Sequence, residues 1–170
     1  MTSIKDPRRQ RLGAIAKAKG KHFEERLDQA FTYYRDRGYA IIEKTPEPMR
    51  PTKNLGNGKF IAFFEKKAQP DYKGVIKGGR AVMLEAKFTS KERMEQDRVE
   101  RGQGEYLDRH QALGARCFVV VGFSTSEVYR MPWDDWKAMK QKWGRKYVTE
   151  ADLKEYRVPT ARNGALLLLD

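Results

Sequence analysis

The chain has 170 residues, enough for one domain that buries roughly two thirds of the surface exposed by its unfolded form. It carries 35 Lys and Arg against 23 Asp and Glu, and this net charge of +12 favours a polyanionic partner such as nucleic acid. The absence of any apolar run of roughly 18 residues argues against a membrane-embedded protein. The single Cys117 excludes a disulfide framework and a cysteine zinc site, and no signal peptide is recognised, so we expect a cytoplasmic protein of the α/β class.

Residues 1–19 are rich in basic side chains and poor in large apolar ones, so we expect a flexible basic arm whose Arg8 and Arg9 contact DNA. The rest of the chain, residues 20–170, is expected to form one domain. Its first element is an amphipathic helix that starts near Lys21, packs on a sheet and ends at Gly38. The apolar stripe of this helix consists of Phe23, Leu27, Ala30, Phe31 and Tyr34.

Glu24 lies in the first turn of this expected helix. The helix dipole favours acidic side chains at that end, which is a sufficient explanation for a glutamate there. The alternative is that Glu24 serves as a third metal ligand.

A short strand is expected from Tyr39 to Lys44, and the three prolines that follow are expected to exclude regular structure up to Pro51. Asn57-Gly58, directly before an apolar run, is typical of a hairpin turn. We therefore expect a basic projection over about residues 46–64, the alternative being an irregular surface loop. The basic residues that we expect to contact DNA in and beyond this projection are Arg50, Lys53, Lys59, Lys66, Lys67 and Lys73.

Two acidic residues, Asp71 and Glu85, lie fourteen positions apart at the ends of two expected strands, with the turn signal Gly78-Gly79 between them. A hairpin would bring the two carboxylates together, with Lys87 on the same side as Glu85; we also expect a β-bulge in the second strand. Two converging carboxylates can hold a hard divalent cation, and the ammonium can stabilise charge on a nearby phosphate. This is the P-D…(D/E)-x-K pattern of nucleases, the alternative being an ordinary turn followed by a polar strand.

Residues 88–102 are almost wholly polar, and we expect a mobile, solvated connection there. Gln103 then opens a helix that ends at Gly114. Two strands are expected next, over residues 117–123 and 128–131.

A further helix is expected to begin with Pro132 at its first position. Its three tryptophans, at spacings of three and seven, favour a place in the core or in an interface over stacking on bases. Thr149 with Asp152 resembles a capping box, and residues 165–169 are expected to form a last strand or a tail that packs in a dimer.

The order of these pieces resembles the RecU family of Holliday junction resolvases over about residues 20–170. The matching landmarks are Gly20-x-x-Phe23-Glu24, Lys44-x-Pro46-x-Pro48, Asp71-Tyr72-x-Gly74, Glu85-Ala86-Lys87, and Gln103 placed fourteen residues before Cys117.

The resemblance implies a restriction-endonuclease-like fold, in which helices flank a mixed β-sheet and a basic stalk protrudes. It implies a homodimeric, Mg²⁺-dependent endonuclease, with Mn²⁺ as a substitute, that nicks two opposed strands of a four-way DNA junction in recombination and repair. Host recombination proteins would be further partners. The resemblance is also compatible with a phage-encoded member of the family. The stretch that would form the stalk is shorter than in the family. This difference concerns selectivity for junctions more than the chemistry of cleavage.

By the same resemblance, Asp71 and Glu85 would be metal ligands together with the backbone carbonyl of Ala86. Lys87 would orient the attacking water or stabilise the pentacovalent phosphate. The two remaining members of the expected site are Glu24, which would support the metal, and Gln103, which would position water or the scissile phosphate.

The residues alone leave two other functions open. One is a metal-dependent nuclease that cuts other branched or duplex DNA. The other is a non-catalytic DNA-binding protein of the same fold, which would have no need to keep Asp71, Glu85 and Lys87 together.

Overall fold

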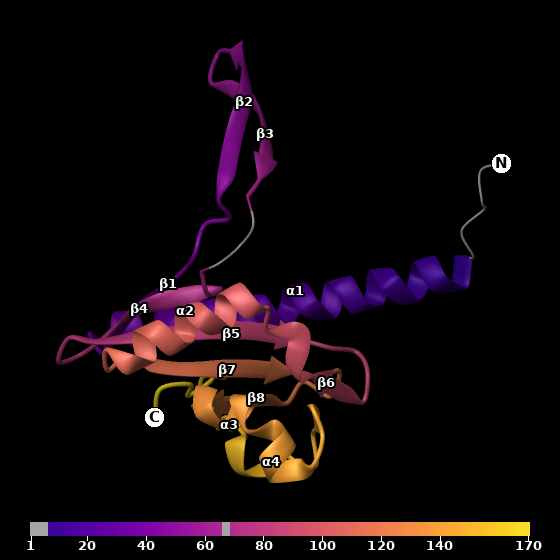
Figure 1. Cartoon of the computed structure of the whole chain (residues 1–170), viewed down its shortest axis with the longest axis vertical. Helices are drawn as coiled ribbons and strands as arrows, with labels where there is room; N and C mark the ends of the chain where they lie inside the picture. Colours follow the sequence, from indigo (N-terminus) through magenta and orange to yellow (C-terminus); the bar gives the residue numbers. More distant parts are fainter. Residues whose placement is uncertain (1–6, 66–68) are drawn as a thin grey trace.

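A five-stranded mixed sheet forms the centre of the protein in the computed structural model, which describes residues 7–65 and 69–170 (Figure 1). The strand order is β1-β4-β5-β7-β8; β5 and β7 are parallel, and the other neighbours are antiparallel. The predicted mixed sheet is therefore confirmed. The strands span Ala40–Lys44 (β1), Tyr72–Ile76 (β4), Arg80–Phe88 (β5), Arg116–Gly122 (β7) and Val128–Pro132 (β8).

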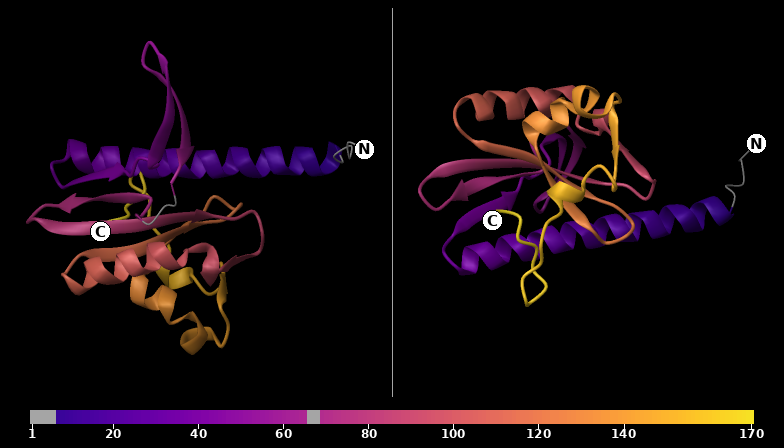
Figure 2. Two further views of the ribbon diagram at one scale, coloured as in Figure 1. Left: turned by 45° about the horizontal axis from the view of Figure 1, so that its top comes forward. Right: turned by 90° about the horizontal axis from the view of Figure 1, so that it is seen from below.

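Helices cover both faces of this sheet (Figure 2). The long helix α1 packs on one face, where its apolar side chains and those of β5 form one core. This core includes Phe23, Leu27, Val82 and Leu84. The helix α2 and the short helices α3 and α4 lie on the other face around a second core that contains Met83 and Trp136. The helices span Pro7–Asp36 (α1), Arg101–Ala112 (α2), Trp133–Lys137 (α3) and Met139–Trp143 (α4).

The strand β5 runs without a bulge, contrary to our expectation. Its register on β7 is continuous from Val82 to Phe88, and its register on β4 is continuous as well. Simple alternation is enough to place Val82, Leu84 and Ala86 on one face and Glu85 on the other.

The helix α1 begins at Pro7, whereas the sequence predicted an irregular arm to residue 19. Its first turns extend past the edge of the sheet, where Leu12 and Ile15 are exposed (Figure 1). The error has a physical reason: Ala, Lys and Arg favour helix without apolar packing, and a helix already anchored at Phe23 extends without a second nucleation step.

A β-hairpin projects from the main body between β1 and β4 and consists of β2 (Met49–Gly56) and β3 (Lys59–Phe64) (Figure 1). Asn57 and Gly58 both have positive φ, 50° and 74°, as a two-residue hairpin turn requires. The predicted basic projection is confirmed as a hairpin. The expectation that Pro51 excludes regular structure is wrong, because each strand of an isolated ribbon has one free edge that tolerates a missing N–H.

Residues 88–102 are not the wholly solvated connection that their composition suggested. They include β6 (Arg93–Glu95), which pairs with β9 (Tyr147–Thr149), and the 3₁₀ turn η1 (Gln96–Arg98). Met94 and Val99 are buried in the core beneath α2. Two apolar side chains in a polar stretch are therefore enough to fix its course.

The C-terminal part also differs in detail from the prediction. Pro132 ends β8 and precedes α3 as its cap, and two short helices interrupted at Ala138 replace one. The buried Trp133 and Trp136 confirm the core assignment of these side chains. After the 3₁₀ turn η2 (Lys154–Tyr156), residues 165–169 do not form a strand, so that alternative is wrong. Leu166, Leu168 and Leu169 pack into the core of the same chain, and a tail that packs in a dimer stays a prediction.

None of the helices in the described ranges combines the length and apolar character needed to cross a membrane.

Candidate active site

The hairpin formed by β4 and β5 positions the two acidic residues of the P-D…E-x-K pattern. Gly78 and Gly79, both with positive φ, form its turn. Tyr72 pairs with Leu84, so one further step in the register sets Asp71 opposite Glu85. Directly opposed residues of an antiparallel pair point to the same face. The sequence prediction that the hairpin brings these carboxylates together is therefore confirmed.

Asp71, Glu85 and Lys87 form one connected cluster. The Lys87 ammonium donates to Glu85 Oε2 at 2.6 Å and to Asp71 Oδ2 at 3.4 Å. The backbone N–H of Ala86 donates to the same Asp71 oxygen at 3.0 Å, which holds this carboxylate against the strand. The side chains of Lys87 and Asp71 are 12% and 16% exposed, and that of Glu85 is fully buried, so the cluster reaches solvent on the Asp71 side.

Close backbone packing beside the cluster depends on Gly74. A Cβ at this position would lie 2.0 Å from the carbonyl oxygen of Ile41 on the neighbouring strand. Only glycine allows β1 to approach β4 so closely, which explains the Gly74 of the Asp71-Tyr-x-Gly motif in structural terms.

Gln103 joins the cluster from α2. Its Nε2 donates to Glu85 Oε2 at 2.8 Å, while its Oε1 accepts the backbone N–H of Glu100 at 3.1 Å. The second contact is half of a capping box at the start of α2, and it fixes which end of the amide faces Glu85. The structure therefore places Gln103 against a carboxylate, where it acts as a donor.

Burial raises the pKa of Glu85 to about 8; the positive charge of Lys87 opposes this shift, and the negative charge of Asp71 adds to it. A carboxylate whose charge is this costly gains most from a nearby cation. Both of its described donors bind Oε2, whereas the buried Oε1 has no hydrogen-bond partner.

These features suit a hard divalent cation. Mg²⁺ is commonly held by one or two carboxylates and completes its shell with water and substrate phosphate, so Asp71 and Glu85 are a sufficient protein donor set. Over the described ranges, no group of three or more His, Cys, Asp or Glu side chains converges, which does not fit a closed zinc site.

Glu24 lies on the α1 side of the sheet, where Lys44 donates to its carboxylate at 2.5 Å. This hydrogen bond is the main cause of the raised pKa of Lys44, and the charge of Asp71 contributes to it. Lys44 contacts Glu24 on this face, whereas Asp71, one residue before the partner Tyr72, faces the other side of the sheet. A direct role of Glu24 or of the Ala86 carbonyl toward a metal remains a prediction.

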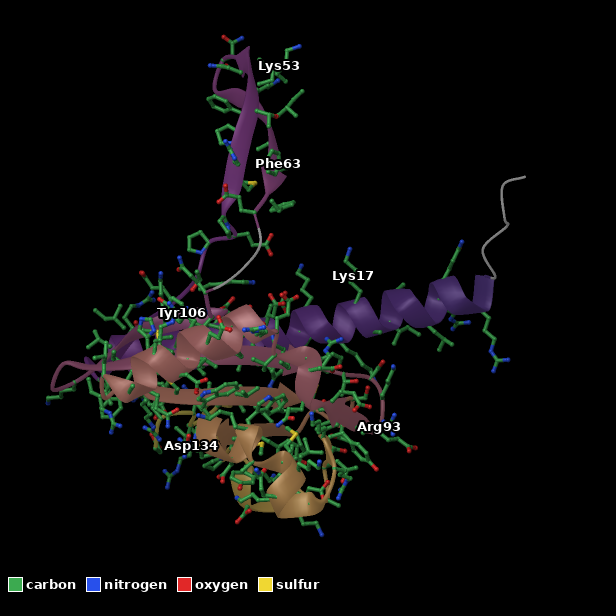
Figure 3. All side chains as sticks on the ribbon, in the orientation of Figure 1. Lys17, Lys53, Phe63, Arg93, Tyr106 and Asp134 are labelled. Atoms are coloured by element: carbon green, nitrogen blue, oxygen red, sulfur yellow. The ribbon has the colours of Figure 1, made fainter. Side chains whose placement is uncertain are left out.

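The predicted DNA-binding residues lie in three places. Figure 3 shows Lys53 on the projecting hairpin and Lys17 on the part of α1 that extends past the sheet, the part that also carries Arg8. Lys73 lies on β4 and donates to Gln69 at 2.7 Å. Arg50 and Lys59 belong to the exposed hairpin, Arg9 lies on α1, and Lys66 and Lys67 are outside the described residues.

Comparison with known proteins gives a consistent result. The profile of the family described as "RecU: Recombination protein U" matches residues 18–168. The Holliday junction resolvase RecU of Streptococcus sanguinis is 31% identical over 121 residues, which are 67% of this chain and 60% of that protein. The match thus spans less than two thirds of this relative's length. The protein of the same name from Geobacillus thermodenitrificans is 28% identical over 163 residues, 87% of this chain and 78% of its own.

Among solved structures, the chain is similar to Archaeoglobus fulgidus Hjc, a Holliday junction resolvase from an archaeal hyperthermophile. The TM-score is 0.46 at 12% sequence identity, over 78% of this chain and 90% of that chain.

Proposed function

Because this chain belongs to the Recombination protein U (RecU) family, we propose that it is a metal-dependent endonuclease that resolves four-way DNA junctions. The single observation that carries this proposal is the convergence of Asp71, Glu85 and Lys87 at one point of the sheet. A protein that only binds DNA would gain nothing from a buried, destabilised Glu85 beside a second carboxylate.

Asp71 and Glu85 would hold Mg²⁺, or Mn²⁺ in its place, and Glu85 would use its buried, unpartnered Oε1. When bound, the cation would polarise the scissile phosphate and lower the pKa of an attacking water. Lys87 would donate to the phosphate oxygens as negative charge develops on them. Gln103 donates to Glu85 Oε2, which would leave the other oxygen of this carboxylate for the cation.

The projecting hairpin would supply junction selectivity. It leaves the sheet between β1 and β4, directly before Asp71, and it carries Arg50, Lys53 and Lys59 on an exposed ribbon. A basic ribbon can enter the open centre of a four-way junction, whereas the stacked centre of a duplex offers no such space.

Symmetric cleavage of two opposed strands requires two sites at a fixed distance, so we propose that the protein acts as a homodimer. The substrate and chemistry fit a protein of the cytoplasm that works together with recombination proteins of the host cell.

A cleavage assay tests the proposal. Purified protein is incubated with a labelled four-way junction and with a linear duplex of equal length, in Mg²⁺ and in EDTA. We expect paired nicks in opposed strands of the junction in Mg²⁺ alone. Cleavage of both DNAs at equal rates would support a general nuclease, and binding without cleavage would support a DNA-binding protein.

A further inference from the structure

Thr45 lies beside the catalytic cluster at the root of the projecting hairpin. It follows the last residue of β1, and its backbone N–H donates to the carbonyl of Asp71 at 2.8 Å. Lys44 pairs with Tyr72, so one further step in the register sets Thr45 opposite Asp71. The side chains of two directly opposed residues share one face of the sheet.

Thr45, Asp71 and Glu85 therefore form one row across three adjacent strands. Asp71 is the middle member, with Thr45 on the β1 side and Glu85 on the β5 side. The row faces the side of the sheet on which Gln103 approaches from α2, while Lys44 and Tyr72 point to the α1 side.

The two outer members of this row share an unusual property. In the described part of the chain, only three buried side-chain oxygen or nitrogen atoms have no hydrogen-bond partner, and two of them are Thr45 Oγ1 and Glu85 Oε1. The third, Gln111 Oε1, lies at the far end of α2. A buried hydroxyl without a partner is unfavourable, and native proteins supply such groups with a bound water or ion. Two such atoms on either side of Asp71 point to a shared, polar ligand.

We propose that Thr45 is a positioning residue of the metal site, whose hydroxyl donates a hydrogen bond to a water molecule in the shell of the cation held by Asp71 and Glu85. Mg²⁺ releases its waters reluctantly and keeps several of them in protein sites, so a neutral donor beside the carboxylates is of use to it. Groups that hydrogen-bond to the shell of a metal commonly change its affinity by about tenfold or more. This inference rests on the proposed function.

The hydroxyl is tested by three substitutions at one position. Thr45→Val removes the hydroxyl and keeps the shape, Thr45→Ala removes it without adding an apolar branch, and Thr45→Ser keeps it. Thr32→Val, on the exposed side of α1, is the matched control. Mn²⁺ is titrated into each protein without DNA, and the free ion is followed by electron paramagnetic resonance, with Mg²⁺ added as competitor.

We expect Thr45→Val and Thr45→Ala to weaken Mn²⁺ and Mg²⁺ binding by about tenfold, and Thr45→Ser and Thr32→Val to bind as the wild type does. The melting temperature of the metal-free Thr45→Val protein should not fall, because an unpaired buried hydroxyl stabilises nothing. The stabilisation that saturating Mn²⁺ gives the wild type should shrink in this variant.

Equal metal affinity in the wild type, Thr45→Val and Thr45→Ala would overturn the inference, and so would a loss confined to the valine variant, because that would be a steric effect. Either result leaves junction cleavage by the wild type untouched. Failure of the wild type to bind Mn²⁺ or to cleave junctions would instead contradict the proposed function.

Discussion

The two oxygens of the Glu85 carboxylate have different surroundings, and this difference is the main structural feature of the site. Lys87 and Gln103 both donate to Oε2, while Oε1 is buried without a partner. Burial makes the charge of this group costly, which is the first cause of its raised pKa. A cation bound there would remove that cost.

Lys87 is expected to act on the chemistry of cleavage and not on the binding of the junction. We expect Lys87→Ala to slow junction cleavage by two to three orders of magnitude, about 3–4 kcal/mol, because one preorganised donor to the developing charge is lost. Lys91→Ala, which removes an exposed cation a few positions along the chain, is the control. Single-turnover rates and junction affinity are measured for both. A Lys87 variant that loses affinity alone would show that this ammonium positions the phosphate and nothing more.

Gln103 connects the site to the start of α2, and its removal should have two effects. We expect Gln103→Ala to lower the cleavage rate, because Glu85 Oε2 loses a donor, and to lower the free energy of unfolding by about 1 kcal/mol, because half of the capping box is lost. Arg101→Ala, in the first turn of the same helix, removes only an exposed ion pair with Glu105 and should change neither quantity appreciably. Cleavage at the wild-type rate in the Gln103 variant would exclude its role at Glu85.

Among the described elements, the hairpin of β2 and β3 differs from the other strands in that none of its residues is buried. All of its residues are exposed, including the apolar Phe60, Ile61, Phe63 and Phe64. A two-stranded ribbon alone is only marginally stable, so we expect this element to be stabilised by a surface that it meets in a complex.

Replacing residues 50–59 by a short Gly-Ser linker should lower the preference for junction over duplex by at least tenfold, about 1.4 kcal/mol. Phosphate contacts along the arms are available on both DNAs and carry no information on shape, whereas the hairpin can fill only the open centre of a junction. Paired titrations of junction and duplex at two salt concentrations give the preference. Substituting Lys53 and Lys59 by Gln is the control for charge alone. An unchanged ratio in the linker variant would mean that shape is read elsewhere.

The turn after β9 offers a test of stability against pH. Asp152 accepts hydrogen bonds from Thr149 N and Oγ1 at 2.7 and 2.8 Å and from Arg145 at 2.6 Å. Burial alone would raise the pKa of Asp152, but the bonds from Thr149 and Arg145 together lower it below its ordinary value of 3.8. A lowered pKa in the folded state means that the stabilisation is complete above about pH 4 and is lost as the pH falls through the folded value.

We therefore expect Asp152→Asn to destabilise the protein by about 1–2 kcal/mol at pH 7. The difference between the two proteins should shrink when the pH is lowered from 5 to 3. Urea unfolding at pH 7, 5 and 3 measures it, and a difference that is independent of pH would show that the ionised carboxylate contributes nothing.

At the scale of the whole molecule, the sequence predicted the features that depend on local rules. The Asn57-Gly58 turn was enough to place the projecting hairpin, and the Gly78-Gly79 turn was enough to bring Asp71 and Glu85 together. The β-bulge that was expected in β5 is absent. The start of α1 was predicted too late in the chain. The prediction followed the apolar side chains that pack on the sheet and took no account of the helix propensity of the residues before them. The course of residues 88–102 was also missed, because it is fixed by two buried side chains, Met94 and Val99, whose partners are distant in sequence.

Part of the site could not be read from the sequence at all. The contact of Gln103 with Glu85 depends on how α2 packs across the sheet. The place of Thr45 beside Asp71 follows from the register of β1 on β4. The long hairpin separates these two strands in the sequence, so their register could not be predicted from the sequence. Only the structure identifies Thr45 as a candidate site residue, because its buried hydroxyl has no hydrogen-bond partner.

We expect Asp71 and Glu85 to form a metal site at which junction DNA is cleaved. The most direct test is to measure binding and cleavage of a labelled four-way junction by the wild type, Asp71→Asn and Glu85→Gln in saturating Mg²⁺. Neutralising either carboxylate weakens the cation site and also removes a negative charge from a surface that approaches phosphate. We predict that both variants lose cleavage and bind the junction as tightly as the wild type or more tightly. Cleavage at near the wild-type rate by either variant would contradict the account.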